Sequence, residues 1–517
     1  MGLSLDYQVA LGLAIFVGII YYASWQRRGR RRHLPPGPRP LPILGNIHQM
    51  TLEYPEKRFA KLREKYGDIV YLKMFNTPVL IINTVHDARE LLERPGKKYL
   101  NRPYSTVKLM ESLGWDHISG FQPYTEEVRK HRRWMHIPFF SKRSLSVVAD
   151  VQRRNAINLL GGLLRNPDDF WAHIHRYTAS TMLQYVSGHT VTSADDSDEY
   201  LDIINKALEE TVRSAAPGTV PVYFLPFLNY IPAWAPGGKY KRNAAWVKSI
   251  VKEAAQRTYD LAESKIGEDK EEHAVIPALI KSSAAKGTLE LERHEIMMFG
   301  LAMYAGGIES SHVAVSVFIL FMVLNPDVYA KAQEEIDRVT CNARLPTIDD
   351  RHALPYLECI LKETYRVSSP APLGVAHETS EDDEYRGYWI PKRTTVITNI
   401  WLMLHDAEAY PDPEVFCPDR FNGLYANQED PRNIIFGFGR RICPGRRFAD
   451  SGIWQAMANI TATFDICKAR DAMGNEITPP GTFTSGLVRH PHRFQCSITP
   501  RSKQAAELIL DKVSEQA

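Results

Sequence analysis

The order of apolar and polar positions predicts a mainly helical protein with a small β region. Apolar side chains recur with the period of an α-helix from about residue 149 to residue 324, and again over 354–367. Strand-like alternation occurs over 69–74, 79–83 and 385–400, the last around the turn Ile390-Pro391-Lys392. Neither a repeat nor a flexible linker divides residues 47–517, so we expect one large helix-rich domain there.

The first 26 residues have a different pattern. From Tyr7 to Trp25 there is no charged side chain, and at 1.5 Å per residue this run spans about 28 Å, the thickness of a bilayer core. Arginines follow at positions 27, 28, 30, 31 and 32, whereas Asp6 is the only charge before the run. The positive-inside rule then predicts a transmembrane signal anchor at residues 1–26. A cleaved signal peptide is the alternative, but its positive charge would precede the apolar core.

Residues 27–46 form a basic, proline-rich segment after this helix. Prolines at positions 35, 36, 38, 40 and 42 fix φ and favour a semi-rigid chain. We therefore expect a hinge that orients the domain 47–517 over the membrane; a ligand for a proline-recognising module is the less favoured alternative. The topology predicts a single-pass protein of the endoplasmic reticulum membrane whose large domain is cytosolic.

Composition and charge exclude several classes of protein. Apolar residues make up 44% of the 517 positions, too many for a disordered chain. The 63 Lys+Arg and 60 Asp+Glu leave a formal net charge of +3, which argues against nucleic-acid binding. Six cysteines without a CxxC pair do not suggest a disulfide scaffold or a zinc finger. His294-Glu295 has no second histidine at the spacing of a zinc hydrolase.

One segment, from Phe436 to Gly445, has the chemistry of a metal-binding thiolate. Cys443 lies in a glycine-bracketed turn, and Pro444 is expected at the first position of a helix, which proline favours. The helix dipole and free N–H groups would stabilise a Cys443 thiolate. Gly439 and Gly445 lack Cβ atoms and would admit a flat rigid ligand, while Arg441 adds a cation suited to a carboxylate.

This segment resembles the haem-binding signature FxxGxRxCxG of the cytochrome P-450 superfamily. Phe436, Gly439, Arg441, Cys443 and Gly445 occupy its fixed positions. The resemblance implies the P-450 fold, a triangular helix-rich prism, behind the transmembrane helix. It also implies haem b with the Cys443 thiolate as axial iron ligand. Residues 371–406 look most like fungal members of secondary metabolism.

Two further motifs follow in the family's order. Glu363-Thr364-Tyr365-Arg366 matches ExxR, whose ends share one helical face and can pair. Pro418-Asp419-Arg420-Phe421 resembles the family's PERF element, with aspartate in place of glutamate. The resemblance implies that Glu363, Arg366 and Arg420 form a structural triad around the cysteine loop.

The segment from Ala305 to Ser311 resembles the family's (A/G)Gx(D/E)T(T/S) motif. The resemblance implies that Glu309 and Ser310 are the catalytic acid and hydroxyl that deliver protons to dioxygen. Serine replaces the usual threonine, which keeps the hydroxyl but loses the methyl that restricts χ1. The adjacent glycines 306 and 307 each cost a helix about 1 kcal/mol, so either a close-packed neighbour or a groove beside the oxygen site must explain them.

Two more residues are assigned to the haem carboxylates by resemblance. Arg132 matches the arginine of the family's WxxxR, although Val128 stands where tryptophan is usual. Arg132 as one of several solvated charges on a basic helix is the alternative. His377 occupies the place of an arginine or histidine near the other propionate, with a satisfied structural histidine as its alternative.

The implied function is a membrane-anchored haem-thiolate monooxygenase with O2 as co-substrate. The chain contains no flavin or iron–sulfur segment, so its electrons would come from an NADPH-cytochrome reductase, with cytochrome b5 as a second donor. Lys130, Arg133, Arg440, Arg446 and Arg447 would form the docking face, with a merely solvated basic face as the alternative.

The substrate is expected to be an apolar small molecule such as a terpenoid or polyketide intermediate. Phe299, Met303, Tyr304, Leu373 and Leu487 lie in segments that line the family's pocket. Two other functions stay open. One is a haem-thiolate isomerase or dehydratase that needs no external electrons, which the serine in the relay motif permits. The other is a haem sensor or carrier without turnover.

Overall fold

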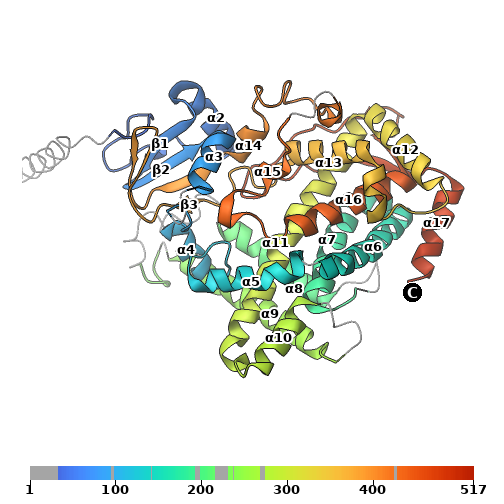
Figure 1. The fold of residues 1–517 in the computed structure, drawn as a ribbon, viewed down its shortest axis with the longest axis horizontal. Coiled ribbons are helices and arrows are strands. Elements are labelled where there is room, and N and C mark those ends of the chain that lie inside the picture. The colour runs from blue at the N-terminus through green and yellow to red at the C-terminus, as the bar shows by residue number, and fades with distance from the viewer. Residues whose placement is uncertain are drawn as a thin grey trace, which may run out of the picture.

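One long helix, α11 (Leu289–Leu324), runs through the middle of a mainly helical molecule (Figure 1). The structure is a computed structural model that describes residues 33–94, 98–140, 142–191, 198–215, 231–236, 238–267, 274–423 and 428–516. The expected transmembrane helix at residues 1–26 lies outside the described residues. The expected mainly α fold with a small β region is confirmed.

The helices form the larger part of the molecule and the strands gather at two of its edges (Figure 1). The other helices are α2 (Pro55–Tyr66), α3 (Val85–Leu92), α4 (Tyr104–Ser112), α5 (Glu126–Phe140), α6 (Lys142–Arg165), α7 (Phe170–Ser187), α8 (Glu199–Ala215), α9 (Lys239–Ser264), α10 (Val275–Ala285), α12 (Pro326–Thr340), α13 (Pro355–Ser368), α14 (Ile400–Leu404), α15 (Arg432–Ile435), α16 (Arg446–Thr463) and α17 (Lys503–Ser514). The strands are β1 (Ile69–Met74), β2 (Thr77–Ile82), β3 (His377–Glu378), β4 (Asp383–Tyr385), β5 (Tyr388–Ile390), β6 (Thr395–Thr398), β7 (Phe464–Arg470), β8 (Glu476–Ile477) and β9 (Cys496–Pro500).

The main sheet has the order β1-β2-β6-β3, and β2 and β6 pair in parallel although they are far apart in the sequence. The alternation over 385–400 therefore does not form one hairpin around Ile390-Pro391-Lys392. Instead β5 pairs with β4 across Arg386 and Gly387, both with positive φ, as a two-residue hairpin loop requires. β6 instead pairs with β2 in parallel and with β3 in antiparallel orientation.

The proline-rich segment is fixed to the main sheet from His33 onward. The Tyr71 N–H donates to the Pro36 carbonyl at 2.7 Å, and the Trp389 N–H donates to the His33 carbonyl at 2.7 Å. A Cβ on Gly37 would stand 1.9 Å from the Tyr71 carbonyl oxygen, so this close approach requires glycine. The described part of the segment is thus docked along β1 and β5 rather than free.

Buried apolar side chains form two large clusters, and α11 belongs to both. Its first half, up to Ile308, packs with α7, α9 and α10, and its second half, from Val313, packs with α6, α7, α13 and α16. Among the described helices it alone is long and apolar enough to cross a membrane, but 67% of its apolar window is buried inside the protein. It is therefore the core helix of the domain. Four polar residues lie between the two apolar halves: Glu309, Ser310, Ser311 and His312.

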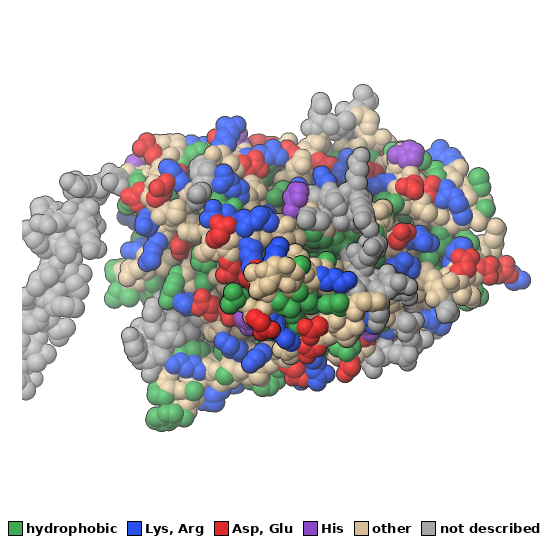
Figure 2. Space-filling view, turned by 60° about the horizontal axis from the view of Figure 1, so that its bottom comes forward, with side chains coloured by type: hydrophobic (Ala, Val, Ile, Leu, Met, Phe, Trp, Pro, Cys, Tyr) green, Lys and Arg blue, Asp and Glu red, His purple; other side chains and the backbone are tan. Residues whose placement is uncertain are grey.

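The surface carries both signs of charge. On the face shown in Figure 2, lysine and arginine side chains alternate with aspartate and glutamate over its whole width. This arrangement agrees with the near balance of 63 Lys+Arg and 60 Asp+Glu. A face with both signs of charge attracts a distant charged partner only weakly, because the two signs largely cancel.

The two adjacent glycines of α11 have different surroundings. A Cβ on Gly307 would stand 2.5 Å from the Met182 Sδ atom of α7, so this glycine permits close helix packing. A Cβ on Gly306 would meet nothing within 4 Å, and Gly306 and Ser310, one turn apart, are both exposed. Close packing therefore explains Gly307, whereas Gly306 has open space beside it and its place beside an oxygen site stays a prediction.

We expect Gly307→Ala to lower the free energy of unfolding by about 1–3 kcal/mol, because the added methyl overpacks the contact with Met182. Gly306→Ala should change that free energy by less than about 1 kcal/mol, because its methyl has space and alanine favours a helix. Urea unfolding of the two full-length variants makes the comparison. Equal destabilisation by both substitutions would contradict this assignment.

Candidate active site

Cys443 ends a tight loop between α15 and α16. Its backbone N–H donates to the Phe436 carbonyl at 2.8 Å, which closes the loop. Gly439 has a φ of 59°, and a Cβ there would stand 2.3 Å from the Leu92 carbonyl oxygen. Only glycine satisfies both conditions, so Gly439 lets the loop press against the end of α3.

The pKa of the Cys443 thiol is raised above its ordinary value, and the expected start of the following helix at Pro444 was wrong. Burial raises this pKa by more than the Gly445 N–H and the charges of Arg132 and Arg446 lower it. The helix α16 begins at Arg446 rather than at Pro444, which leaves the sulfur outside its first turn. A thiolate here needs a bound metal ion, which deprotonates a coordinating thiol.

One buried arginine, two half-buried arginines and a buried histidine converge beside this loop from distant parts of the chain. They are Arg102, Arg132, Arg441 and His377. Each guanidinium donates to main-chain carbonyl oxygens, and His377 contacts the Tyr99 carbonyl through Nδ1 at 2.7 Å. The carbonyl acceptors are those of Gly120, Val375 and Ala376 for Arg102, those of Leu100, Ser119 and Gln122 for Arg441, and that of Ile442 for Arg132, at 2.6–2.9 Å.

This arginine cluster concentrates positive charge. Burial, then repulsion from Arg441 and Arg132, holds the pKa of Arg102 well below its usual range. Burial and then Arg132 lower the pKa of Arg441 to about 10. Burial, then Arg102, lowers the pKa of His377 far enough to keep it neutral. Within the described part of the chain, no carboxylate forms an ion pair with any of the three arginines.

A ligand with carboxylate groups fits this cluster. Buried charge is costly unless it is paired, and the two propionates of haem would supply the missing negative charge. Arg132 donates to the carbonyl of Ile442, next to Cys443, at 2.6 Å, and its charge lowers the pKa values of both Cys443 and Arg441, so the cluster lies beside the cysteine loop. The residues present therefore fit haem.

Arg102 was missed in the sequence analysis although it is only 5% exposed. Its local signal is faint, because Asn101-Arg102-Pro103 follows the apolar pair Tyr99 and Leu100 and matches no motif used above. Its role depends on carbonyl groups of the loop at 113–125 and of the chain just before β3. The sequence does not place these segments beside each other.

Glu309 and Ser310 lie on different sides of α11. The Ser310 hydroxyl donates to the Gly306 carbonyl at 3.2 Å and is exposed. The Glu309 carboxylate points toward histidines, with His490 Nε2 at 3.3 Å and His175 Nε2 at 3.8 Å. Consecutive residues of a helix do not share a face, so the structure does not bring the acid and the hydroxyl into contact.

Histidines set the charge state of Glu309. Burial would raise the pKa of Glu309, but the bond with His490 and the charges of His312 and His175 outweigh burial and lower it. Burial lowers the pKa of His312 to about 3, and both of its ring nitrogens lack a partner among the described residues. The carboxylate is therefore ionised at neutral pH.

The expected pocket wall is only partly open. Phe299, Met303 and Tyr304 are packed in the core cluster with α7 and α9, so they do not present free surface. Leu373 is half-buried and Leu487 is half exposed. The place of these three side chains in a pocket wall stays a prediction, since in this structure other helices enclose the first half of α11.

Comparison with known proteins decides the family. The sequence model of the family "Cytochrome P450" matches residues 35–498. The chain belongs to the cytochrome P450 family. It is 40% identical to "Cytochrome P450 monooxygenase 176" of Postia placenta, over 93% of this chain and 93% of that protein. It is 35% identical to "Tryptamine 4-monooxygenase" of Psilocybe cyanescens, over 97% of this chain and 99% of that protein. The protein is accordingly a haem-thiolate monooxygenase.

The P450 places Glu363, Arg366 and Arg420 in direct contact. Arg366 forms a two-bond pair with Glu363 at 2.8 and 2.9 Å, and Arg420 Nε donates to the same carboxylate at 3.2 Å. The Cys417 N–H supplies a further bond at 2.8 Å, and the side chain of Glu363 is fully buried. Both arginines also donate to carbonyl groups of residues 404–415, so the triad fixes the chain that leads to the cysteine loop.

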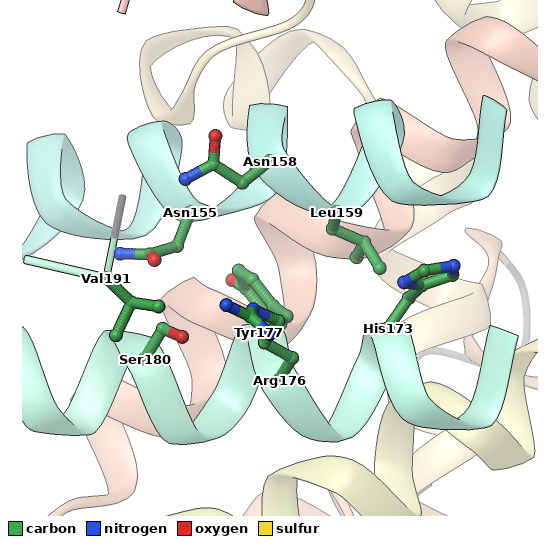
Figure 3. A pocket seen from close by; sticks show the side chains of 8 residues that line it. All are labelled: Asn155, Asn158, Leu159, His173, Arg176, Tyr177, Ser180 and Val191. Carbon is green, nitrogen blue, oxygen red and sulfur yellow. The ribbon is translucent and has the colours of Figure 1, made fainter. Parts of the chain in front are cut away.

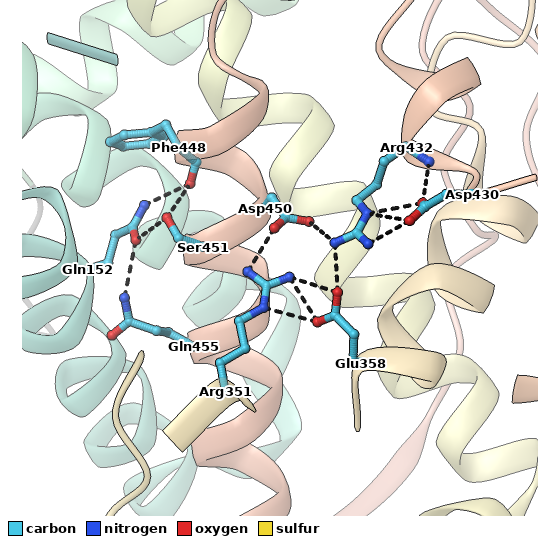
Figure 4. A network of polar contacts seen from close by, with 9 residues as sticks. All are labelled: Gln152, Arg351, Glu358, Asp430, Arg432, Phe448, Asp450, Ser451 and Gln455. Carbon is cyan, nitrogen blue, oxygen red and sulfur yellow. Dashed lines mark hydrogen bonds and ion pairs between the residues drawn. The ribbon is translucent and has the colours of Figure 1, made fainter. Parts of the chain in front are cut away.

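A second polar network holds α16, the helix after the cysteine loop (Figure 4). On one side Gln152 of α6 donates to the Phe448 carbonyl at 2.8 Å and accepts from Ser451 at 2.8 Å. On the other side Asp450 pairs with Arg351 at 2.7 Å, and Arg351 pairs with Glu358 of α13 at 2.9 Å. The start of α16 is thus tied to α6 and α13, which limits movement of Cys443.

A small cavity between α6 and α7 does not qualify as a substrate site. Side chains of both helices point into it, among them Asn155, Asn158, His173 and Tyr177 (Figure 3). Its volume of about 20 Å³ holds about one water molecule. The P450 substrate must therefore bind elsewhere.

Replacing Glu363 by glutamine tests the triad. The variant leaves two buried guanidinium groups without a counter-charge, so we expect the free energy of unfolding to fall by about 3–5 kcal/mol. Urea unfolding of the full-length protein measures the change. Glu209→Gln is the matched control, since its pair with Arg213 at 2.7 Å is exposed, and it should change the value by less than about 0.5 kcal/mol. Equal effects in both variants would contradict a structural role for the triad.

Proposed function

We propose that this P450 is a membrane-anchored monooxygenase that transfers one oxygen atom of O2 to an apolar small molecule, with electrons from an NADPH-dependent reductase. The observation that carries this proposal is the arginine cluster beside the Cys443 loop, whose charge is unpaired among the described residues. The near-full-length similarity to proteins named as P450 monooxygenases supports it.

The chain's own residues would hold haem from two sides. Cys443 would ligate the iron, and Arg102, Arg132 and Arg441 would bind the propionates, with neutral His377 beside them donating its Nδ1–H to the Tyr99 carbonyl. Haem with a thiolate ligand supplies the activation of dioxygen. Phe436 and Gly439 shape the loop that sets the position of the sulfur, and Gly445 donates its N–H toward the thiol.

Two residues of α11 would handle protons. Ser310 presents its hydroxyl on the exposed side of the helix, where Gly306 leaves space. Glu309 faces the opposite group of histidines and is ionised, so it can accept a proton from His490 and release it toward the Ser310 side by a change of rotamer. The helix thereby links a protonatable cluster to the substrate side.

The substrate is proposed to be an apolar intermediate of a terpenoid or polyketide pathway. The apolar residues of α11 and the expected membrane anchor both favour a lipid-soluble ligand. One relative is named for tryptamine, a small flat aromatic amine, so a substrate screen should also include compounds of that kind.

The reductase is proposed to approach the side of the cysteine loop. Of the five cations expected there, Lys130 is paired with Glu292 and Glu295, and Arg133 with Glu126, so these two contribute little net charge. Arg440, Arg446 and Arg447 flank Cys443 directly in the sequence and complete the proposed docking face. Anchoring of residues 1–26 in the endoplasmic reticulum membrane would bring both proteins into one plane.

The carbon monoxide difference spectrum of the reduced full-length protein tests the haem assignment. We expect a far red-shifted Soret band in the wild type and its loss in Cys443→Ser, because a serine oxygen cannot replace the thiolate. Cys359→Ser, another buried cysteine, is the control and should keep the band. A band retained in Cys443→Ser, or haem bound without such a band in the wild type, would refute the proposed ligand.

Glu309→Gln tests the ionised state of this carboxylate. Its pKa is lowered in the folded protein, so its stabilising contribution is present above the unfolded pKa of about 4.3 and is lost as the pH falls through the folded value. The variant should therefore be less stable than the wild type at pH 6, and the difference should shrink below about pH 4. Turnover should fall about 100-fold. Glu384→Gln, on the surface, is the control; a difference that grows on acidification would contradict the assignment.

A further inference from the structure

Two histidines and an aspartate meet where the loop at 113–125 passes the first turns of α11. The Nε2 atoms of His117 and His294 each lie 3.9 Å from the same oxygen of Asp116. The two imidazole rings are 5.0 Å apart in an edge-to-face arrangement. We propose that Asp116, His117 and His294 bind a divalent metal ion of the zinc type, separate from the haem site.

The ring of His117 is oriented for metal binding. Its Nδ1 lies 2.5 Å from the Glu127 carboxylate, and its Nε2 lies on the side of Asp116 as the atom that would ligate the ion. A carboxylate behind a ligating histidine is the usual support of zinc sites, because it fixes the tautomer and the ring orientation. Glu127 is thus a positioning residue for the site.

The distances suit zinc. Ligand atoms at 2.0–2.1 Å from a tetrahedral ion stand about 3.3 Å apart, so the observed 3.9 Å needs a closure of about 0.6 Å. The side chains of Asp116 and His294 are 40% and 55% exposed and can move this far. Two imidazoles and one carboxylate are a common zinc set that leaves the fourth position to water.

Charge and space also favour a cation here. Among the described residues, no lysine or arginine forms an ion pair with Asp116 or Glu127, whereas the neighbouring Lys130 is already paired with Glu292 and Glu295. A cavity of about 350 Å³ lies beside the site and has room for a water ligand. Its lining includes His117, Glu127 and His294, together with Lys130 and Arg133, which are both paired with glutamates.

A bound ion would fasten the loop at 113–125 to α11 from outside. On the inside the carbonyls of Ser119, Gly120 and Gln122 in this loop already accept from Arg441 and Arg102. Metal binding would therefore restrain the same backbone that surrounds the arginine cluster. This effect on the loop rests on geometry alone and does not depend on turnover.

Metal binding to the full-length, haem-loaded protein in detergent tests the proposal. Zn2+ titration followed by calorimetry should show one equivalent bound in the wild type, and the site should be lost in His294→Gln and Asp116→Asn. Glu127→Gln should weaken affinity by about 10–100-fold without abolishing binding. Co2+ at the same site should give the visible absorption of a four-coordinate ion, and Zn2+ should slow amide exchange within residues 113–125.

Two matched variants assign the signal. His352→Gln removes an exposed histidine elsewhere, and His490→Gln disturbs the group formed with Glu309 and His312, so both should bind zinc as the wild type does. Exposed Cys341 and Cys467 are present in every variant and cannot produce a difference between them. Equal stoichiometry and affinity in wild type and His294→Gln, or loss of the signal only in His490→Gln, would overturn the proposal.

Discussion

The guanidinium groups of Arg102, Arg132 and Arg441 lie close together beside the Cys443 loop, so Arg441 and Arg132 lower the pKa of Arg102, and Arg132 lowers that of Arg441. Like charges at this distance repel one another. Each guanidinium group is stabilised by hydrogen bonds to backbone carbonyl oxygens from other segments of the chain. These carbonyls are dipoles and do not neutralise the charge. Negative charge from a ligand would therefore stabilise this cluster, as the proposed binding of the haem propionates requires.

The charge of Glu363, by contrast, is paired within the protein. Its carboxylate accepts from Arg366, Arg420 and a backbone N–H, and every guanidinium in that group also reaches carbonyls. A charged side chain whose partners are all within the protein holds its neighbours in place. A charged side chain without a counter-charge can instead bind a ligand of opposite charge. The two clusters therefore have complementary roles. The Glu363 triad fixes the chain that leads to the cysteine loop, and the arginine cluster provides positive charge beside that loop for a ligand.

The central helix α11 separates two environments over a single turn. Ser310 and Gly306 face the open side, while Glu309 enters a group of histidines that keeps it ionised. The change occurs between the two apolar halves of the helix, where polar residues interrupt the core. A helix anchored at both ends by apolar packing can carry polar chemistry at its centre without losing stability.

The sequence alone determined what depends on short spacing. The cysteine loop, the i,i+3 pair Glu363 and Arg366, the strand β1 and the long helix α11 are all recognisable from residues that lie close together in the chain, because local sterics and helical period govern them. The tertiary structure alone decided the rest. Arg102 gained its place from carbonyls about 270 residues away, and Glu309 gained its histidines from α7 and from the chain before β9. Burial likewise raised the pKa of Cys443 against the local expectation. Desolvation and charge interactions depend on what surrounds a group in space, and no local pattern records that.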